Sequence, residues 1–242
     1  MTESIDILAI IIVTLGIGVQ AWIGLGFGLL SAPLLYFISP DYVPGPILLL
    51  GFVLSALVVL RNYQQMNWQR ILPACLARIP GAWCGALLLA SLPQNLVSIL
   101  FGLSLLLAIQ VTRSRVNLAP SSGVLSIAGF FSGLLGTATS VGGPPMAMAY
   151  QQSDRLTTRN DLALFFLITT PVSLIMLAIN NYFSWQTFML TLPLLPGVFL
   201  GYKLAGFVSR QFPGTNVKPL IIGLCTLAAT GILLKGLWSS FA

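Results

Sequence analysis

Residues 133–149 read G-L-L-G-T-A-T-S-V-G-G-P-P-M-A-M-A, a hydrophobic run interrupted at six glycine or proline positions. A related stretch, I-G-L-G-F-G-L-L-S-A-P, occupies residues 23–33. In a helix interior each glycine costs about 1 kcal/mol and each proline about 3 kcal/mol relative to alanine. The two stretches therefore predict broken helices inside apolar segments, and we expect the breaks to form a binding site.

The composition is that of an integral membrane protein. Of the 242 residues, 57% are hydrophobic and 7% are charged, whereas a soluble domain has about 25% charged residues. The formal net charge is +6, but the basic residues lie singly or in pairs between apolar runs. This pattern is typical of the positive-inside rule and argues against a nucleic-acid partner. The first apolar run has no basic flank and no small-residue cleavage site, so we expect no cleaved signal peptide.

Several kinds of chemistry are excluded by what the sequence lacks. It has no histidine, and Cys75, Cys84 and Cys225 fall in apolar runs without C-x-x-C spacing. We therefore expect neither a disulfide framework nor a metal site. No phosphate-loop or dinucleotide-binding motif is present in its proper context, and the apolar runs contain almost no carboxylate that could act as a catalytic acid or base. We predict that the protein is not an enzyme and uses no cofactor.

Hydropathy divides the chain into apolar segments of two kinds. A bilayer core of about 30 Å needs around 20 helical residues, and six segments have the length of one such span. The first and fifth segments are longer and contain the glycine-rich stretches. The segments are residues 5–37, 44–60, 71–92, 94–112, 119–150, 162–179, 185–209 and 216–238.

The order of one long and three single segments occurs twice, which predicts an internal repeat within one membrane domain. The repeats cover residues 1–115 and 116–242. The supporting matches are Pro33 with Pro144 or Pro145, Trp68 with Trp185, and Pro80-Gly81-x-x-x-Gly85 with Pro196-Gly197-x-x-x-Gly201.

The positions of Lys and Arg predict how the repeats are oriented. Basic residues cluster between segments, at 61–70, 113–115, 153–160 and 207–218. All four clusters lie on one side of the membrane if each long segment crosses it an even number of times, as a re-entrant hairpin or as two short spans. Because Lys and Arg bias sets topology, we predict cytoplasmic basic loops and both termini on the opposite side. Each repeat then makes an odd net number of crossings, so the fold is all-α with two inverted repeats, a recurrent transporter plan.

The two glycine-rich tips form the predicted anion site. A half-helix that begins near tandem prolines presents free N–H groups and about half a positive charge, which suits an oxyanion. The alternative is that the glycines only allow close helix packing. The candidate residues are Gln20, Trp22, Gly24, Gly26, Gly28 and Ser31 at the first tip, and Thr137, Thr139, Ser140, Gly142 and Gly143 at the second.

Charged residues near or inside the segments are further candidates. Arg78 either attracts the anion, as an intramembrane ionisable residue, or extends its long side chain to the surface. Lys203 lies near the basic end of its span and is expected to extend to the surface. We expect Asp154, Arg155, Arg159 and Asp161 to form an ordinary solvated loop, with proton coupling by Asp161 as the alternative.

The G-L-G-F-G-L-L-S-A-P stretch and the G-L-L-G-T-A-T-S-V-G-G-P-P stretch resemble the TauE/SafE sulfite exporters. The resemblance extends over nearly the whole chain, including the two-half layout. It implies a bacterial inner-membrane transporter that exports sulfite, sulfoacetate or related organosulfonates, or facilitates their movement. The denser G-x-G-G-G pattern of the family is interrupted here at Leu25 and Phe27 and from Ala138 to Val141. Family members are often drawn with eight transmembrane helices, whereas the charge pattern favours even crossings of the long segments.

Three alternatives remain open at the level of sequence. The first is a carrier of thiosulfate or another reduced-sulfur anion, with the cysteines contributing weak S–H contacts. The second is a carrier of carboxylated anions. Another is a membrane scaffold without transport activity. A homo-oligomer is compatible with all of these functions.

Overall fold

The computed structural model describes residues 2–23, 26–113, 119–211 and 218–241. In these ranges the regular structure is entirely helical, and six helices are long and apolar enough to cross a membrane. Many large apolar side chains, such as those of Leu15, Leu60 and Ile127, are exposed on the outside of the bundle. A surface of this kind is expected where the solvent is lipid. The prediction of an all-helical, multi-pass membrane protein is confirmed.

The helices follow the predicted apolar segments. The first half contains α1 (Thr2–Ile23), α2 (Phe27–Ile38), α3 (Gly45–Asn62), α4 (Trp68–Ser91) and α5 (Gln94–Arg113), with short 3-10 turns at Pro40–Tyr42 and Tyr63–Gln65. The second half contains α6 (Ser122–Thr139), α7 (Gly143–Ala149), α8 (Arg155–Ile179), α9 (Trp185–Thr191), a 3-10 turn at Leu192–Leu194, α10 (Leu195–Gln211) and α11 (Lys218–Phe241). The predicted boundary between the repeats, at 115 and 116, lies outside the described residues.

Both glycine-rich stretches interrupt their helices. α1 ends at Ile23, and Gly26 precedes α2 with a φ of 129°, which L side chains rarely adopt. α6 ends at Thr139, and Ser140 follows it in the left-handed region with a φ of 64°. α7 then begins at Gly143, with prolines in its first turn, where a missing N–H costs nothing.

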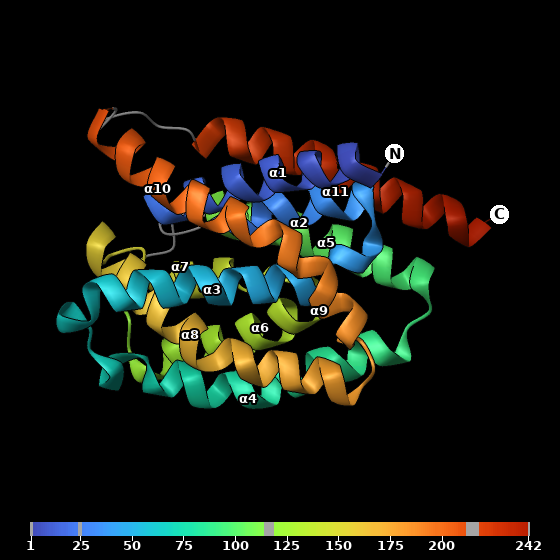
Figure 1. Cartoon of the computed structure of the whole chain (residues 1–242). Helices are drawn as coiled ribbons and strands as arrows, with labels where there is room; N and C mark the ends of the chain where they lie inside the picture. Colours follow the sequence, from blue (N-terminus) through green and yellow to red (C-terminus); the bar gives the residue numbers. More distant parts are fainter. Residues whose placement is uncertain (1, 24–25, 114–118, 212–217, 242) are drawn as a thin grey trace.

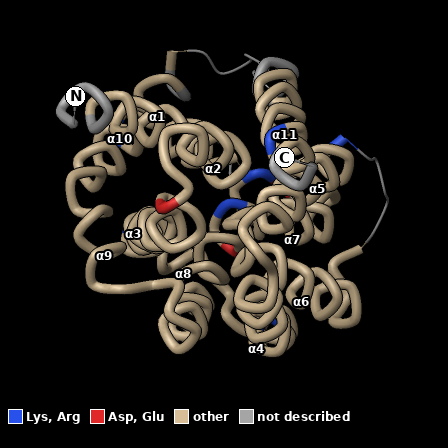
Figure 2. Tube along the Cα trace, turned by 90° about the vertical axis from the view of Figure 1, so that its right-hand side faces the viewer, with Lys and Arg blue, Asp and Glu red and all other residues tan. Residues whose placement is uncertain are grey.

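The helices of the two halves contact each other in matching pairs (Figure 2). α4 packs along α6 as α10 packs along α1, and α5 contacts α7 as α11 contacts α2. The pairs α3 with α8 and α5 with α11 join equivalent helices of the two halves. The second half therefore repeats the contacts that the first half makes.

Glycines bring the α4–α6 and α1–α10 pairs into backbone contact. A Cβ added at Gly85 would lie 2.4 Å from the carbonyl oxygen of Leu134, and one added at Gly201 would lie 2.4 Å from the carbonyl oxygen of Thr14. Real Cβ atoms do not approach backbone this closely, so only glycine fits at either position. The two Pro-Gly-x-x-x-Gly motifs thus occupy corresponding contacts, each against the first helix of the other half.

The two ends of the bundle differ in what they carry (Figure 1). α1 begins and α11 ends at one end, together with the turns after α2 and α8. The turns between α3 and α4 and between α7 and α8 lie at the opposite end. Arg61, Arg113 and Arg155, which lie on helix ends there, are all exposed.

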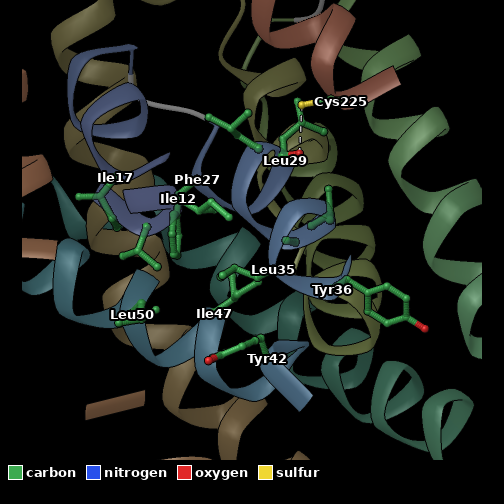
Figure 3. Packing of buried hydrophobic residues seen from close by; sticks show 14 of the residues in the cluster. Ile12, Ile17, Phe27, Leu29, Leu35, Tyr36, Tyr42, Ile47, Leu50 and Cys225 are labelled. Atoms are coloured by element: carbon green, nitrogen blue, oxygen red, sulfur yellow. Dashed lines mark hydrogen bonds between the residues drawn. The ribbon is translucent and has the colours of Figure 1, made fainter. Parts of the chain in front are cut away.

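The largest buried apolar cluster lies around α2 (Figure 3). Ile12 and Ile17 of α1 and Leu50 of α3 pack with Phe27 and Leu35 of α2 in this cluster. The thiol of Cys225 in α11 donates a hydrogen bond of 3.1 Å to the carbonyl oxygen of Leu29. The short helix α2 is therefore held inside the protein by helices from both halves.

The single span predicted at residues 185–209 corresponds to the candidate span Trp185–Val208. It consists of two helices joined by a 3-10 turn, because Pro193 interrupts the regular hydrogen-bonding pattern. One local prediction was wrong. Residues 153–160, with Asp161, do not form a solvated loop: α8 begins at Arg155 because the carboxylate of Asp154 accepts the N–H groups of Leu156 and Thr157, both at 2.9 Å. Asp161 consequently lies one and a half turns inside the helix and is buried.

We predict that Gly201→Leu destabilises the protein strongly, whereas Gly206→Leu in the same helix does not. A side chain at position 201 meets the α1 backbone, while nothing lies within 4 Å of a Cβ at Gly206. Overpacking costs about 1–3 kcal/mol even where side chains can adjust, and backbone adjusts less. Thermal unfolding of the detergent-purified variants measures the difference. Equal melting temperatures would show that α1 and α10 are not in backbone contact.

Candidate functional site

Arg78 lies near the middle of α4 and its side chain is 0% exposed. Its Nη1 donates a hydrogen bond to Ser132 Oγ at 2.9 Å, and its Nη2 donates to Ser173 Oγ at 3.4 Å. The rings of Phe165 and Phe166 lie 5.1 and 5.2 Å from its Cζ, within the range of cation–π contacts. The side chain therefore stays inside the bundle, and the alternative that it extends to the surface was wrong.

The two serines connect Arg78 to the second helix break. Ser132 Oγ donates a hydrogen bond of 2.6 Å to the carbonyl oxygen of Gly142. Thr137 Oγ1 donates a hydrogen bond of 2.9 Å to Ser173 Oγ. Hydroxyl groups of α6 and α8, a guanidinium from α4 and the backbone of the α6–α7 break thus converge in one buried cluster, which we call the Arg78 cluster.

No carboxylate neutralises Arg78 among the described residues. Asp41 accepts a hydrogen bond from Ser39, Asp154 caps α8, and Asp161 pairs with Arg70. Arginine keeps its proton in proteins, and a buried ion costs several kcal/mol unless it is paired. The Nε of Arg78 also has no hydrogen-bond partner. The cluster therefore offers N–H donors and an unbalanced positive charge, which together suit an anion.

Glycines of the 133–149 stretch make room for this arginine. A Cβ added at Gly133 would lie 2.5 Å from the carbonyl oxygen of Arg78, and one added at Gly136 would lie 3.3 Å from its Nη2. A Cβ at Gly136 would also lie 3.2 Å from Cα of Gly142. Because Gly136 has no side chain, only its backbone lies between the Arg78 guanidinium and Gly142 at the helix break.

The other candidates of the second tip have partners within the protein. Thr139 Oγ1 donates to the carbonyl oxygen of Leu135 at 2.7 Å, and Ser140 Oγ donates to that of Pro44 at 2.9 Å. A Cβ at Gly142 would lie 2.7 Å from the carbonyl oxygen of Ser132, so close packing alone requires glycine there. Gly143 is the first residue of α7 and is partly exposed. A direct role of these residues toward an anion stays a prediction.

The structure brings the two tips into contact with each other. A Cβ added at Gly28 would lie 2.4 Å from the carbonyl oxygen of Ser140, so the start of α2 touches the end of α6. The amide oxygen of Gln20 accepts the N–H of Phe27 at 2.9 Å and thereby caps α2. The break between α1 and α2 is thus stabilised from within the first tip.

The remaining candidates of the first tip do not join the Arg78 cluster. Ser31 Oγ donates to the carbonyl oxygen of Ile12 at 3.2 Å, and Gly26 supplies the positive φ before α2. The carbonyl oxygen of Trp22 accepts a hydrogen bond from Arg155, whose Cζ lies 5.9 Å from the Trp22 ring. Gly24 lies outside the described residues.

Asp161 lies apart from the Arg78 cluster. It is 2% exposed, and its Oδ2 accepts a hydrogen bond of 3.1 Å from Arg70 Nη1, which ties α8 to α4. This ion pair gives the carboxylate a structural partner. Proton coupling by Asp161 stays a prediction, to be tested by whether Asp161→Asn removes a dependence of flux on a pH gradient.

Four residues that contact Arg78 were missed from the sequence. Ser132 directly precedes the second glycine-rich stretch, and Phe165, Phe166 and Ser173 lie in a segment that was predicted only as a span. A signal did exist for one of them, because Ser173 follows Thr169-Thr170-Pro171 within a segment that is otherwise apolar. In the described part of the chain, no group of three His, Cys, Asp or Glu side chains could hold a metal ion.

Comparison with known proteins finds one family. The model of the family described as "Sulfite exporter TauE/SafE" matches residues 8–232. No curated protein and no solved structure gives a significant match. The match covers both helix breaks and every residue of the Arg78 cluster.

We predict that Arg78→Met leaves the unliganded protein as stable as the wild type or makes it more stable. Replacing a buried charge by an apolar side chain of similar volume is often neutral or stabilising, and Ser132 and Ser173 keep their bonds to Gly142 and Thr137. Arg70→Met should instead cost about 1–3 kcal/mol, because Asp161 loses its partner. Thermal unfolding in buffer without oxyanions compares the two variants. Unfolding of the Arg78 variant under conditions where the wild type folds would contradict the prediction.

Proposed function

Since the chain belongs to the sulfite exporter TauE/SafE family, whose members are membrane transporters and not enzymes, we propose that it carries small sulfur oxyanions across the membrane. The proposed substrates are sulfite, sulfoacetate and related organosulfonates, moved by export or facilitated movement. The family supports the substrate class, and the Arg78 cluster supports binding of an anion.

The observation that carries the proposal is a fully buried arginine without a carboxylate partner. A bound oxyanion would supply the missing negative charge and accept from the free Nε. The planar guanidinium matches two oxygens of a sulfonate as it matches those of a carboxylate or phosphate. Ser173 Oγ accepts hydrogen bonds from Arg78 and Thr137, so its own hydrogen can be donated to the anion.

The proposed architecture is two inverted repeats, with the anion held near the membrane midplane where the broken helices meet. The support is that the helix pairs of one half recur in the other and that the two Pro-Gly-x-x-x-Gly motifs make corresponding contacts. Contact between Gly28 and Ser140 supports a shared position for the two breaks. Arg78 lies about half-way along its spanning helix, which supports binding at this depth.

The proposed location is the bacterial inner membrane, with the end of the bundle that carries Arg61, Arg113 and Arg155 in the cytoplasm. The positive-inside rule supports this orientation, and α1 begins at the other end of the bundle, where α11 also ends. Lys203, exposed on α10, then reaches toward lipid headgroups as expected for a long basic side chain.

The positions of the three cysteines do not favour a carrier in which their thiols together contact a reduced-sulfur anion. Cys75 is buried one helical turn before Arg78, but Cys84 is exposed and Cys225 is bonded to α2. The three thiols do not gather at one place. Thiosulfate and carboxylated anions remain compatible with the Arg78 cluster as oxyanions.

We predict that wild-type protein in proteoliposomes carries labelled sulfite and that Arg78→Met lowers the flux at least about tenfold, because loss of one partner from a buried charge pair costs about 2–5 kcal/mol. Arg78→Lys should give an intermediate rate, since lysine keeps the positive charge but cannot make bidentate hydrogen bonds to the anion. Lys203→Met removes an equal charge from the exposed face of α10 and should leave the flux unchanged.

Two results would contradict the proposal in different ways. A wild-type protein that moves no anion of this class would be a scaffold. Equal flux through the wild type and Arg78→Met would place the anion elsewhere in the protein.

We predict that Gln151→Cys reacts with an impermeant thiol reagent from the cytoplasm and Asp41→Cys from the opposite side, in a protein without its native cysteines. Both positions are exposed, in turns at opposite ends of the bundle. Gln64→Cys, at the same end as Gln151, is the matched control. Reaction of positions 41 and 151 from the same side would reject the even-crossing topology.

A further inference from the structure

A small pocket opens between α1, α3 and α8, apart from the Arg78 cluster. Its lining comes from the end of α1 near the first break, from the half of α3 that ends at Asn62, and from the first turns of α8. Its lining residues are Gln20, Ala21, Leu54, Ser55, Val58, Arg159, Leu162, Ala163 and Phe166.

Arg159 is the charged residue of this lining. It was expected in a solvated loop, but it lies on the second turn of α8 and is only partly exposed. Its Nε is buried and has no hydrogen-bond partner. The neighbouring carboxylates do not compensate it, because Asp154 caps the helix and Asp161 pairs with Arg70. Arg159 is thus a second guanidinium without a described anionic partner.

The polar groups beside Arg159 bring no negative charge, and one of them, Gln20, offers a donor. The amide oxygen of Gln20 is occupied by the N–H of Phe27, which leaves the NH₂ group of Gln20 as its donor. The hydroxyl of Ser55 donates to the carbonyl oxygen of Gly51 at 2.8 Å. The other lining residues are apolar. A pocket with one guanidinium, one amide and no carboxylate is suited to an anion.

Phe166 connects the pocket to the Arg78 cluster. Its side chain lines the pocket, and its ring also lies 5.2 Å from Cζ of Arg78. Arg159 and Phe166 are two turns apart on α8, so the pocket and the Arg78 cluster lie at successive depths along one helix. The ring of Phe166 thus borders both the pocket and the Arg78 guanidinium, and it is only partly buried.

We propose that the pocket at Arg159 is a second, peripheral binding site for the transported oxyanion, occupied before the anion passes Phe166 to reach Arg78. This inference rests on the proposed function. It assigns to Gln20 a role as ligand at the peripheral site, at the end of the bundle that carries the basic turns. The pocket has a volume of about 10 Å³, which is room for about one water-sized group. We therefore expect it to take one oxygen of a sulfite or sulfonate group whose other oxygens stay outside it.

The test measures labelled sulfite transport in membrane vesicles of both orientations. Arg159→Gln should raise the KM for sulfite about tenfold where the Arg159 end faces the sulfite, corresponding to about 1.4 kcal/mol, while kcat stays within about twofold. Arg159→Lys should give a smaller rise in KM. Arg61→Gln is the matched control, because it removes an equal charge from the same end of the protein outside the pocket.

A second variant separates a binding site from a general effect of charge. Ala21→Val fills the pocket with two methyl groups and keeps Arg159, so it should raise KM as Arg159→Gln does. If the wild type carries sulfite and both variants have the KM of Arg61→Gln, the peripheral site is rejected and the proposed function stands. If the wild type carries no sulfite, the proposed function itself fails.

Discussion

The position of the Arg78 guanidinium inside the bundle is the constraint on which the rest of the structure depends. A charged side chain at this depth needs neighbouring groups that accept its hydrogen bonds, or aromatic rings whose faces lie against it. Ser132 of α6 and Ser173 of α8 do the first, and Phe165 and Phe166 do the second. Helices α4, α6 and α8 therefore have to meet, and they can meet only because α6 presents glycine to the backbone of α4.

The helix breaks are tolerable because protein, rather than lipid, surrounds them. The first break is capped by Gln20, and the second is held by hydrogen bonds between Ser132 and Gly142 and between Ser140 and Pro44. Contact between Gly28 and Ser140 joins the breaks to each other. The same glycines that interrupt the helices also allow the close contacts, so the packing and binding interpretations of these stretches are not exclusive.

Helix α8 links the features relevant to transport. From its capped start onward, Arg159 lines the pocket, Asp161 pairs with Arg70, Phe166 borders both the pocket and Arg78, and Ser173 contacts Arg78. Arg159 lies on α8 and Arg78 lies on α4 against α8, and neither has a described carboxylate partner. We propose that the two guanidinium groups mark a path for an anion. Both depend on the scarcity of acidic residues in this chain, which has five.

Composition and local pattern were sufficient to predict a helical membrane protein and the two helix breaks, because hydropathy, helix propensity and span length act over short stretches of chain. They also singled out Arg78, but left open whether its side chain stays inside the bundle or extends to the surface. The partners of Arg78 could not be predicted, since Ser132 and Ser173 lie 54 and 95 residues away and look like ordinary small residues in apolar spans. The burial of Asp161 likewise follows from its pairing with Arg70, 91 residues earlier. The sequence by itself determined which segments enter the membrane and where they break. Only the tertiary structure decided which polar groups share the interior, because that depends on which helix faces pack together.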